Sequence, residues 1–123
     1  PEGTSTDGLN VAPFKSSLFS IVLGADRSDL YVQPVTIKLM TVNKQVPGTI
    51  NQRRLYTWPL EDNIDLASHL WRFAKTKGAT LNLYFHPIIK ANEYNDRKAL
   101  AKACHEAVQK PLNPDTETNQ IAA

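Results

Sequence analysis

The chain is poor in cysteine, in long apolar runs and in net charge. Its 123 residues include a single cysteine, Cys104, which excludes an internal disulfide and a cysteine-based metal cluster. The apolar runs are far shorter than the roughly 20 residues that span a bilayer, and no signal segment opens the sequence, so we expect no membrane partner. The formal net charge of +2 permits nucleic-acid binding without requiring it.

Residue groupings that are typical of enzymes are scarce too. The three histidines show no pair at metal-ligand spacing; they are His69, His86 and His105. Cys104 falls on an apolar helical stripe, where a small buried side chain is expected rather than a nucleophile. Asp62 with Asp65, or Glu61 with Asp62, could form an acid/base pair, but capping and solubility explain these residues more simply. With no phosphate loop, nucleophile elbow or metal motif, we expect no enzyme, no cofactor and no metal.

The organisation of the chain is that of one domain with an arm. At 13.7 kDa it is large enough for one modest core. Residues 1–13 are rich in Gly, Ser, Thr and Asp with few apolar anchors, which predicts a mobile arm. Residues 14–123 form the predicted domain.

Alternating apolar residues predict several strands. Residues 17–23, closed by a turn cluster at 24–27, and residues 30–32 are candidates. The clearest is 35–42, where alternation puts Val35, Ile37 and Leu39 on the core face. The turn pair Pro47-Gly48 then predicts a hairpin with a second strand over 52–58.

The spacing of apolar residues changes from alternating to helical near residue 62, and the remaining chain is expected to contain two helices. Apolar spacing over 62–77 predicts a helix that Asn63 or Asp65 caps and Gly78 ends. A strand is expected over 80–89, then a helix from near Asn92 or Asn95 that Pro111 stops. The sum is an α+β fold: an antiparallel meander of about five strands plus a weak N-terminal hairpin, with helices gathered toward the C-terminus.

The polar face of the predicted sheet combines cations, amides, hydroxyls and aromatic rings. Such a face suits single-stranded RNA, because cations meet phosphates and rings stack on bases. An ordinary solvated sheet face is the simpler alternative, and a single bulge would change which residues point outward. The candidate RNA-binding residues are Thr36, Lys38, Met40, Arg54, Tyr56, Trp58, Asn82 and Tyr84.

The terminal helix has a stripe of mostly small residues, so it buries little surface by itself. Docking on the sheet of a second copy would complete that burial, which favours an obligate dimer. The candidate interface residues are Leu100, Ala103, Cys104, Ala107 and Val108.

The ending of the chain resembles the coat proteins of single-stranded RNA bacteriophages of the levivirus type. Those chains end in a strand that runs into a proline, a short Asn-containing hinge and helices. The matching features here are residues 81–89, Pro87-Ile88-Ile89, Asn92, the helix through Lys110, Pro114, and the tail 121–123. The helical spacing over 64–77 departs from the family, which has a loop and the start of a strand there.

The resemblance implies a homodimer that assembles into an icosahedral shell, with the inner sheet face on genomic RNA and possibly on a translational-operator hairpin. It places the protein in the virion, and in the host cytoplasm during assembly. The alternatives are a small, non-assembling dimeric RNA-binding regulator and, more remotely, an enzyme with an unrecognised site.

Overall fold

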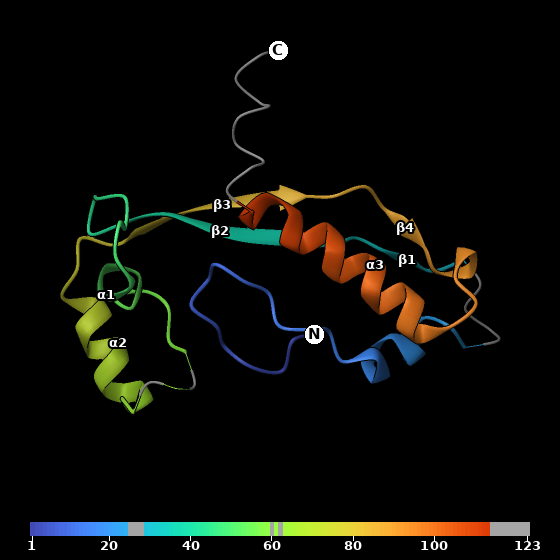
Figure 1. Cartoon of the computed structure of the whole chain (residues 1–123), viewed down its shortest axis with the longest axis horizontal. Coiled ribbons are helices and arrows are strands. Elements are labelled where there is room, and N and C mark those ends of the chain that lie inside the picture. The colour runs from blue at the N-terminus through green and yellow to red at the C-terminus, as the bar shows by residue number, and fades with distance from the viewer. Residues whose placement is uncertain (25–28, 60, 62, 114–123) are drawn as a thin grey trace, which may run out of the picture.

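The computed structural model describes residues 1–24, 29–59, 61 and 63–113. Most of the predicted turn at 24–27, Asp62, Pro114 and the tail at 121–123 lie outside the described residues. The fold class is α+β, as predicted, with antiparallel strands and several short helices (Figure 1).

The strands form two antiparallel pairs rather than a five-stranded meander. β2 (Val35–Val42) pairs with β3 (Ala79–Phe85), and β1 (Tyr31–Val32) pairs with β4 (Ile89–Lys90). Pro34 and Pro87 separate the two pairs, since proline has no N–H to donate to a ladder. The His86 N–H still donates to the Pro34 carbonyl across 3.0 Å, so the ribbon continues through the interruption.

The predicted hairpin between 35–42 and 52–58 is wrong. Residues 50–53 form a short helix, α1 (Ile50–Arg53), because Thr49 and Gln52 build a capping box in which each side chain accepts from the other residue's N–H. The helix diverts the chain after the Pro47-Gly48 turn, and β2 pairs instead with a strand much further along the sequence.

The helix predicted over 62–77 is confirmed as α2 (Leu66–Ala74), and Asp65 is its cap. The Asp65 carboxylate accepts from the Ser68 N–H and hydroxyl, which holds the pKa of Asp65 below its usual value. Gly78 has a φ of +94°, a backbone conformation that suits glycine, and turns the chain into β3.

The strand predicted over 17–23 is wrong: this segment is a 3₁₀ helix, η1 (Ser16–Ile21). Its Phe19 is buried against the last long helix, α3 (Arg97–Gln109), and the short η2 (Ala91–Glu93). The core therefore lies between η1, α3 and the β1–β4 pair; its buried members are Phe19, Ala91, Leu100, Ala101 and Cys104. The tertiary packing of one aromatic ring has overridden the strand preference of the segment.

The cap of α3 is Asp96 rather than the predicted Asn92 or Asn95. Its carboxylate accepts from the N–H groups of Lys98 and Ala99, and these bonds lower the pKa of Asp96. The α-helix ends at Gln109, before Pro111, and a 3₁₀ turn, η3 (Lys110–Leu112), follows it directly.

The small-residue stripe of α3 is covered within the chain itself. Leu100, Cys104 and Val108 are buried, and Ala103 and Ala107 are half-buried. Small residues allow the Phe14 and Phe19 rings, which stack at 6.2 Å, to lie close to the helix. The stripe therefore needs no second copy to explain it, although the dimer interface predicted there stays a prediction.

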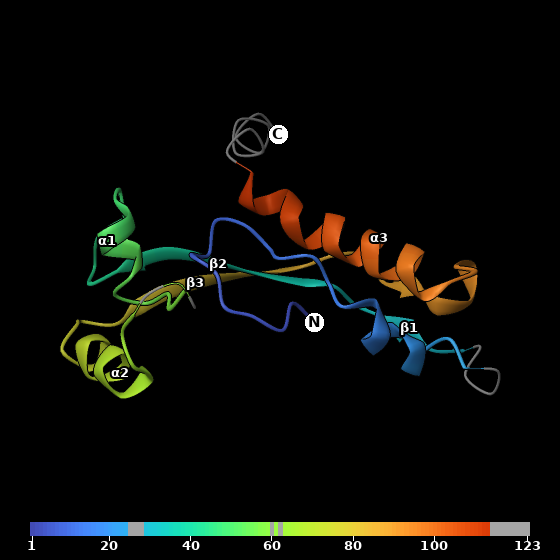
Figure 2. The same ribbon diagram turned by 60° about the horizontal axis from the view of Figure 1, so that its bottom comes forward.

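Near the start of β2, the face that was predicted to be exposed is buried, and the face that was predicted to be buried is exposed. Thr36 is 1% exposed and Ile37 is 58% exposed. Figure 2 shows α3 along one face of the β2–β3 ribbon. The hydrogen bond from Thr36 to Val108 of α3 puts Thr36 on that face, and the N-terminal segment lies on the same side. A register shift between Leu39 and Thr41 then changes the alternation. The exposed face pairs Ile37 with Leu83 and carries Leu81 and Phe85 beside them.

Candidate functional site

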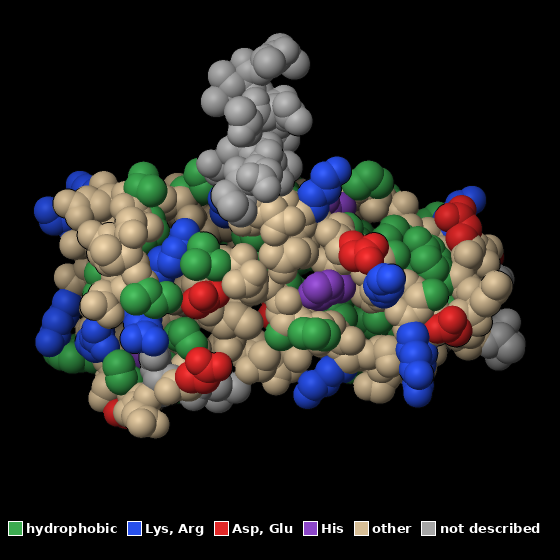
Figure 3. Space-filling view, viewed as in Figure 1, with side chains coloured by type: hydrophobic (Ala, Val, Ile, Leu, Met, Phe, Trp, Pro, Cys, Tyr) green, Lys and Arg blue, Asp and Glu red, His purple; other side chains and the backbone are tan. Residues whose placement is uncertain are grey.

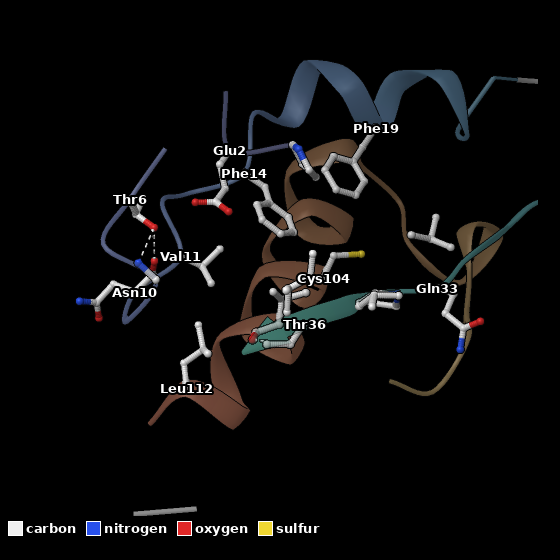
Figure 4. A pocket seen from close by; sticks show the side chains of 17 residues that line it. Glu2, Thr6, Asn10, Val11, Phe14, Phe19, Gln33, Thr36, Cys104 and Leu112 are labelled. Atoms are coloured by element: carbon white, nitrogen blue, oxygen red, sulfur yellow. Dashed lines mark hydrogen bonds between the residues drawn. The ribbon is translucent and has the colours of Figure 1, made fainter. Parts of the chain in front are cut away.

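A pocket of about 430 Å³ lies where the N-terminal segment crosses the start of β2 and the C-terminal half of α3 (Figure 4). Most of its lining is apolar: the apolar residues are Val11, Phe14, Phe19, Val32, Pro34, Val35, Ile37, Cys104, Val108 and Leu112. The polar groups at the pocket come chiefly from the N-terminal segment. An apolar hollow with a few polar groups and a volume in this range is typical of a small-molecule site.

The N-terminal segment, predicted as a mobile arm, is folded into a loop in the structure. The Lys15 N–H donates to the Pro1 carbonyl across 3.0 Å, which closes the loop. Inside it the Thr6 hydroxyl donates to the Asn10 carbonyl, and the Leu9 N–H donates to the Asp7 carboxylate. Gly8, at φ +76°, lets the chain reverse here.

Two contacts fix this loop on α3. The Val11 N–H donates to the Gln109 side-chain oxygen across 2.7 Å. His105 donates its Nε2 proton to the Val11 carbonyl across 2.9 Å, and its ring meets Phe14 edge-on. The main chain at Val11 therefore has both polar groups paired with the same helix, which positions one wall of the pocket.

Glu2 is the carboxylate at the pocket. One of its oxygens accepts from the Ala12 N–H at 2.9 Å, so the side chain is held across the loop. A carboxylate with further lone pairs in an otherwise apolar hollow is suited to a cationic or hydrogen-bond-donating group.

Thr36 joins the pocket floor to the end of α3. Its hydroxyl donates to the Val108 carbonyl at 2.6 Å and contacts His86 Nε2 at 2.8 Å. Because the hydroxyl has one proton, the His86 contact is an N–H donated by the ring, which puts the imidazole proton on Nε2. Burial, and secondarily the Lys110 charge, lowers the pKa of His86, so the ring is neutral at neutral pH.

Cys104 faces the same pocket from α3. It is buried, and burial raises the pKa of its thiol. The protonated thiol is a poor nucleophile, so Cys104 serves as part of the apolar wall.

The predicted RNA-binding residues separate into two groups. Five lie on the β2–β3 ribbon, where Thr36 pairs with Tyr84 and Lys38 with Asn82; this group is Thr36, Lys38, Met40, Asn82 and Tyr84. The pairing puts Thr36, Lys38, Asn82 and Tyr84 on one side of the ribbon, and Met40 sits at the register shift. That side is not the outward face that was predicted, because Thr36 is buried against the end of α3.

The other three follow α1 and are in no strand. Arg54 ends α1, Tyr56 packs edge-on against Phe73, and Trp58 stacks on His69. The structure thus places them beside α2 rather than on the sheet. A role of either group in RNA binding is not tested by the geometry.

The residues that sequence reasoning missed are Glu2, Thr6 and Asn10. The available signal was the run of turn-forming residues between Gly3 and Asn10, which favours local side-chain-to-backbone hydrogen bonds as much as mobility. Among the described residues, no group of three or more His, Cys, Asp or Glu side chains could hold a metal ion. None of the helices in the described ranges is both long and apolar enough to cross a membrane.

The chain is similar to two curated proteins over most of its length. It is 35% identical over 112 residues to a lyso-ornithine lipid O-acyltransferase of Rhodobacter capsulatus, a match that covers 89% of this chain and 37% of that protein. It is 31% identical over 112 residues to the lyso-ornithine lipid O-acyltransferase of Brucella abortus, covering 88% of this chain and 41% of that protein. The chain therefore spans about two fifths of the length of these relatives.

The remaining comparisons add little. A shorter match, 29% identical over 68 residues, is to a peptidyl-prolyl cis-trans isomerase-like 2 of Aspergillus fumigatus and covers only 12% of that protein. No protein-family model matches the chain. No solved structure matches it.

The similarity to the acyltransferases overturns the coat-protein prediction. That prediction depended on the order and spacing of common elements, whereas this similarity is 35% and 31% residue identity over 112 aligned residues. The other predictions that depended on the coat-protein resemblance are therefore wrong as well: the capsid and RNA-regulator functions, the RNA and shell partners, and the virion location. The predictions of no enzyme and no membrane were also wrong, because both relatives are named as enzymes that act on a lipid.

Proposed function

We propose that this chain is part of an O-acyltransferase whose acceptor is a lyso-lipid of the ornithine type. The observation that carries the proposal is the 35% and 31% identity over 112 residues to two proteins named for that activity. An O-acyltransferase moves an acyl group onto a hydroxyl oxygen, so it must hold two apolar chains out of water while their polar ends meet.

The pocket behind the N-terminal loop suits one of these chains. Its walls are apolar and come from three separate parts of the sequence: the N-terminal loop, β2 and α3. Moving a hydrocarbon chain from water into a pocket with such walls lowers the free energy by about 25 cal/mol per Å² of apolar surface buried. The pocket would therefore bind the reactant by its tail and leave the ester-forming end near the loop.

Glu2 supports the ornithine part of the proposal. The amino group of ornithine is a cation at neutral pH, like that of lysine, and a carboxylate at the edge of an apolar pocket attracts such a group. Because the Ala12 N–H already holds one Glu2 oxygen, the side chain is oriented before the lipid arrives. Glu2 is thus proposed as a binding group for the headgroup.

The test is acyl transfer by the purified full-length protein. Lyso-ornithine lipid dispersed in detergent is incubated with an activated acyl donor, such as an acyl thioester, and the lipids are analysed by mass spectrometry. The expected product is heavier than the acceptor by one acyl group. If wild-type protein forms no such product with this or other lyso-lipids, the proposed function is wrong.

The role of Glu2 is tested by Glu2→Gln. We expect a rise in KM for the acceptor of about tenfold, typical of a lost charge-assisted hydrogen bond, with a smaller change in kcat. The matched control is Glu106→Gln on the exposed side of α3, outside the pocket lining, which should leave KM unchanged. An unchanged KM in Glu2→Gln would remove the headgroup assignment while leaving acyl transfer intact.

A further inference from the structure

Helix α2 carries an apolar face that none of the described residues covers. Leu66, Leu70 and Trp71 are 49%, 55% and 66% exposed. At 100° per residue they share one side of the helix with the exposed Ala67 and Ala74. Three large apolar side chains together on one short helix form a patch, unlike isolated surface leucines, which need no explanation.

The apolar face is not the side by which α2 attaches to the rest of the protein. That attachment is made by His69, which is buried and donates to the Tyr56 carbonyl at 3.2 Å, and by Phe73, which meets the Tyr56 ring. Trp58 stacks on His69 and donates from its ring to the Ile64 carbonyl, which closes the connection. With the anchoring residues on this side, the leucines and Trp71 are turned outward.

Cations border the apolar face. Lys75 and Lys77 are exposed at its C-terminal end, whereas the exposed Arg72 lies on the opposite side of the helix. From residue 64 to residue 78 the only acidic residue is Asp65, at the other end of α2. The Lys75 ammonium lies 5.3 Å from the centre of the Trp71 ring, so its stem runs along the apolar patch. Figure 3 shows Lys and Arg side chains next to hydrophobic ones over the end of the molecule where α1 and α2 lie.

We propose that α2 docks on the surface of an anionic lipid bilayer, with Leu66, Leu70 and Trp71 in the interface and Lys75 and Lys77 at the headgroups. This proposal rests on the proposed function for its choice of partner, since a lipid substrate reaches the protein from a membrane. A helix with an apolar face, flanking lysines and an outward Trp has the features of interfacial binding. Negative lipid headgroups complement the excess of positive charge on this segment.

A second exposed apolar surface in the described part of the chain lacks this combination. The β2–β3 face with Ile37, Leu83 and Phe85 has no charged residue among the paired positions of its side. Nothing in the described residues indicates what would cover it, so the membrane proposal is confined to α2.

The test is vesicle flotation with the purified full-length protein and its variants. Wild type should bind mixed phosphatidylglycerol–phosphatidylcholine vesicles more tightly than phosphatidylcholine alone. Leu70→Glu should weaken binding to the mixed vesicles by about tenfold or more, and Lys75→Gln by about fivefold. Matched controls are Leu18→Glu, a half-exposed leucine on η1 at the other end of the molecule, and Lys102→Gln on α3.

Tryptophan fluorescence supplies a second readout. On addition of anionic vesicles the emission should shift to shorter wavelength, and Trp71→Phe should abolish the shift, because the half-buried Trp58 is held against His69 and the Ile64 carbonyl, away from the apolar face. Circular dichroism before flotation establishes that each variant is folded. Equal binding by wild type, Leu70→Glu and Leu18→Glu overturns the proposal. So does a sizing-column shift with Leu70→Glu without an effect on vesicles, which would assign the face to a second copy.

The failure of this inference and that of the proposed function are distinguishable. If docking is right, Leu70→Glu lowers acyl transfer to an acceptor in vesicles but not to the same acceptor dispersed in detergent. If wild type transfers no acyl group yet binds vesicles through Leu70, only the function is wrong. If it transfers acyl groups and Leu70→Glu changes neither binding nor vesicle activity, only the docking face is wrong.

Discussion

Thr36 offers the sharpest test of how the pocket floor is held. Its side chain is 1% exposed and connects β2 to the end of α3 through the Val108 carbonyl and to His86. Val108 is in the last turn of α3, whose carbonyls lack partners within the helix. The substitution Thr36→Val keeps the shape of the side chain but removes the hydroxyl.

The cost follows from what is left unpaired. An orphaned buried carbonyl costs about 1–3 kcal/mol, and the half-buried His86 N–H, which water can reach, costs less, so we expect a loss of about 2–3 kcal/mol for Thr36→Val. Thr36→Ser keeps both hydrogen bonds and loses one methyl group, worth about 1 kcal/mol. The valine variant should therefore be the less stable of the two, although it is the more apolar.

Urea unfolding followed by circular dichroism measures these differences. At about 4 °C per kcal/mol for a chain of this size, Thr36→Val should also melt about 10 °C below wild type. The control is Thr80→Val on the exposed side of β3, for which we expect a change within about 0.5 kcal/mol. A Thr36→Val protein as stable as Thr36→Ser, or as the Thr80 control, would refute the assignment of the hydroxyl to Val108.

Three further predictions concern single groups. Burial holds the pKa of His86 in the folded protein below the usual histidine value of about 6.5. Its contribution to stability is therefore complete above that value and is lost as the pH falls through the lower, folded pKa; the unfolding free energy should fall on acidification below about pH 6.5, and less so in His86→Gln. The buried Cys104 thiol, with its raised pKa, should react with Ellman's reagent on the order of a hundredfold more slowly in native protein than in urea; equal rates would contradict its burial. Gly8→Ala forces a Cβ to 3.1 Å from Thr57 at a φ of +76° and should cost about 1–2 kcal/mol, whereas Gly24→Ala, with open space around it, should be neutral in the same unfolding assay.

The candidate site was the part of the protein that sequence reasoning predicted least well. Glu2 and Asn10 lie in a segment with few apolar residues, and such composition predicts mobility. What holds this segment against α3 in the structure is its contact with Gln109 and His105, about a hundred residues away in the sequence. Hydrogen bonds between residues so far apart produce no periodic pattern in the sequence of either segment.

The class of protein was missed for a related reason. A strand, a proline and a helix in that order are shared by many unrelated folds, so their layout supported a coat protein as readily as anything else. Residue identity along the chain to the two acyltransferases carries information that element order does not.

The sequence by itself determined the elements whose signal is local. Alternation defined β2 and the two faces of β3, and apolar spacing with an Asp cap defined α2, because dihedral preference, side-chain period and capping all act within a few residues. Only the tertiary structure decided which strand β2 pairs with and which of its faces is buried. Thr36 is inside because its hydroxyl reaches the Val108 carbonyl, 72 residues further on. Ile37, the more apolar neighbour, is outside because α3 covers the other face.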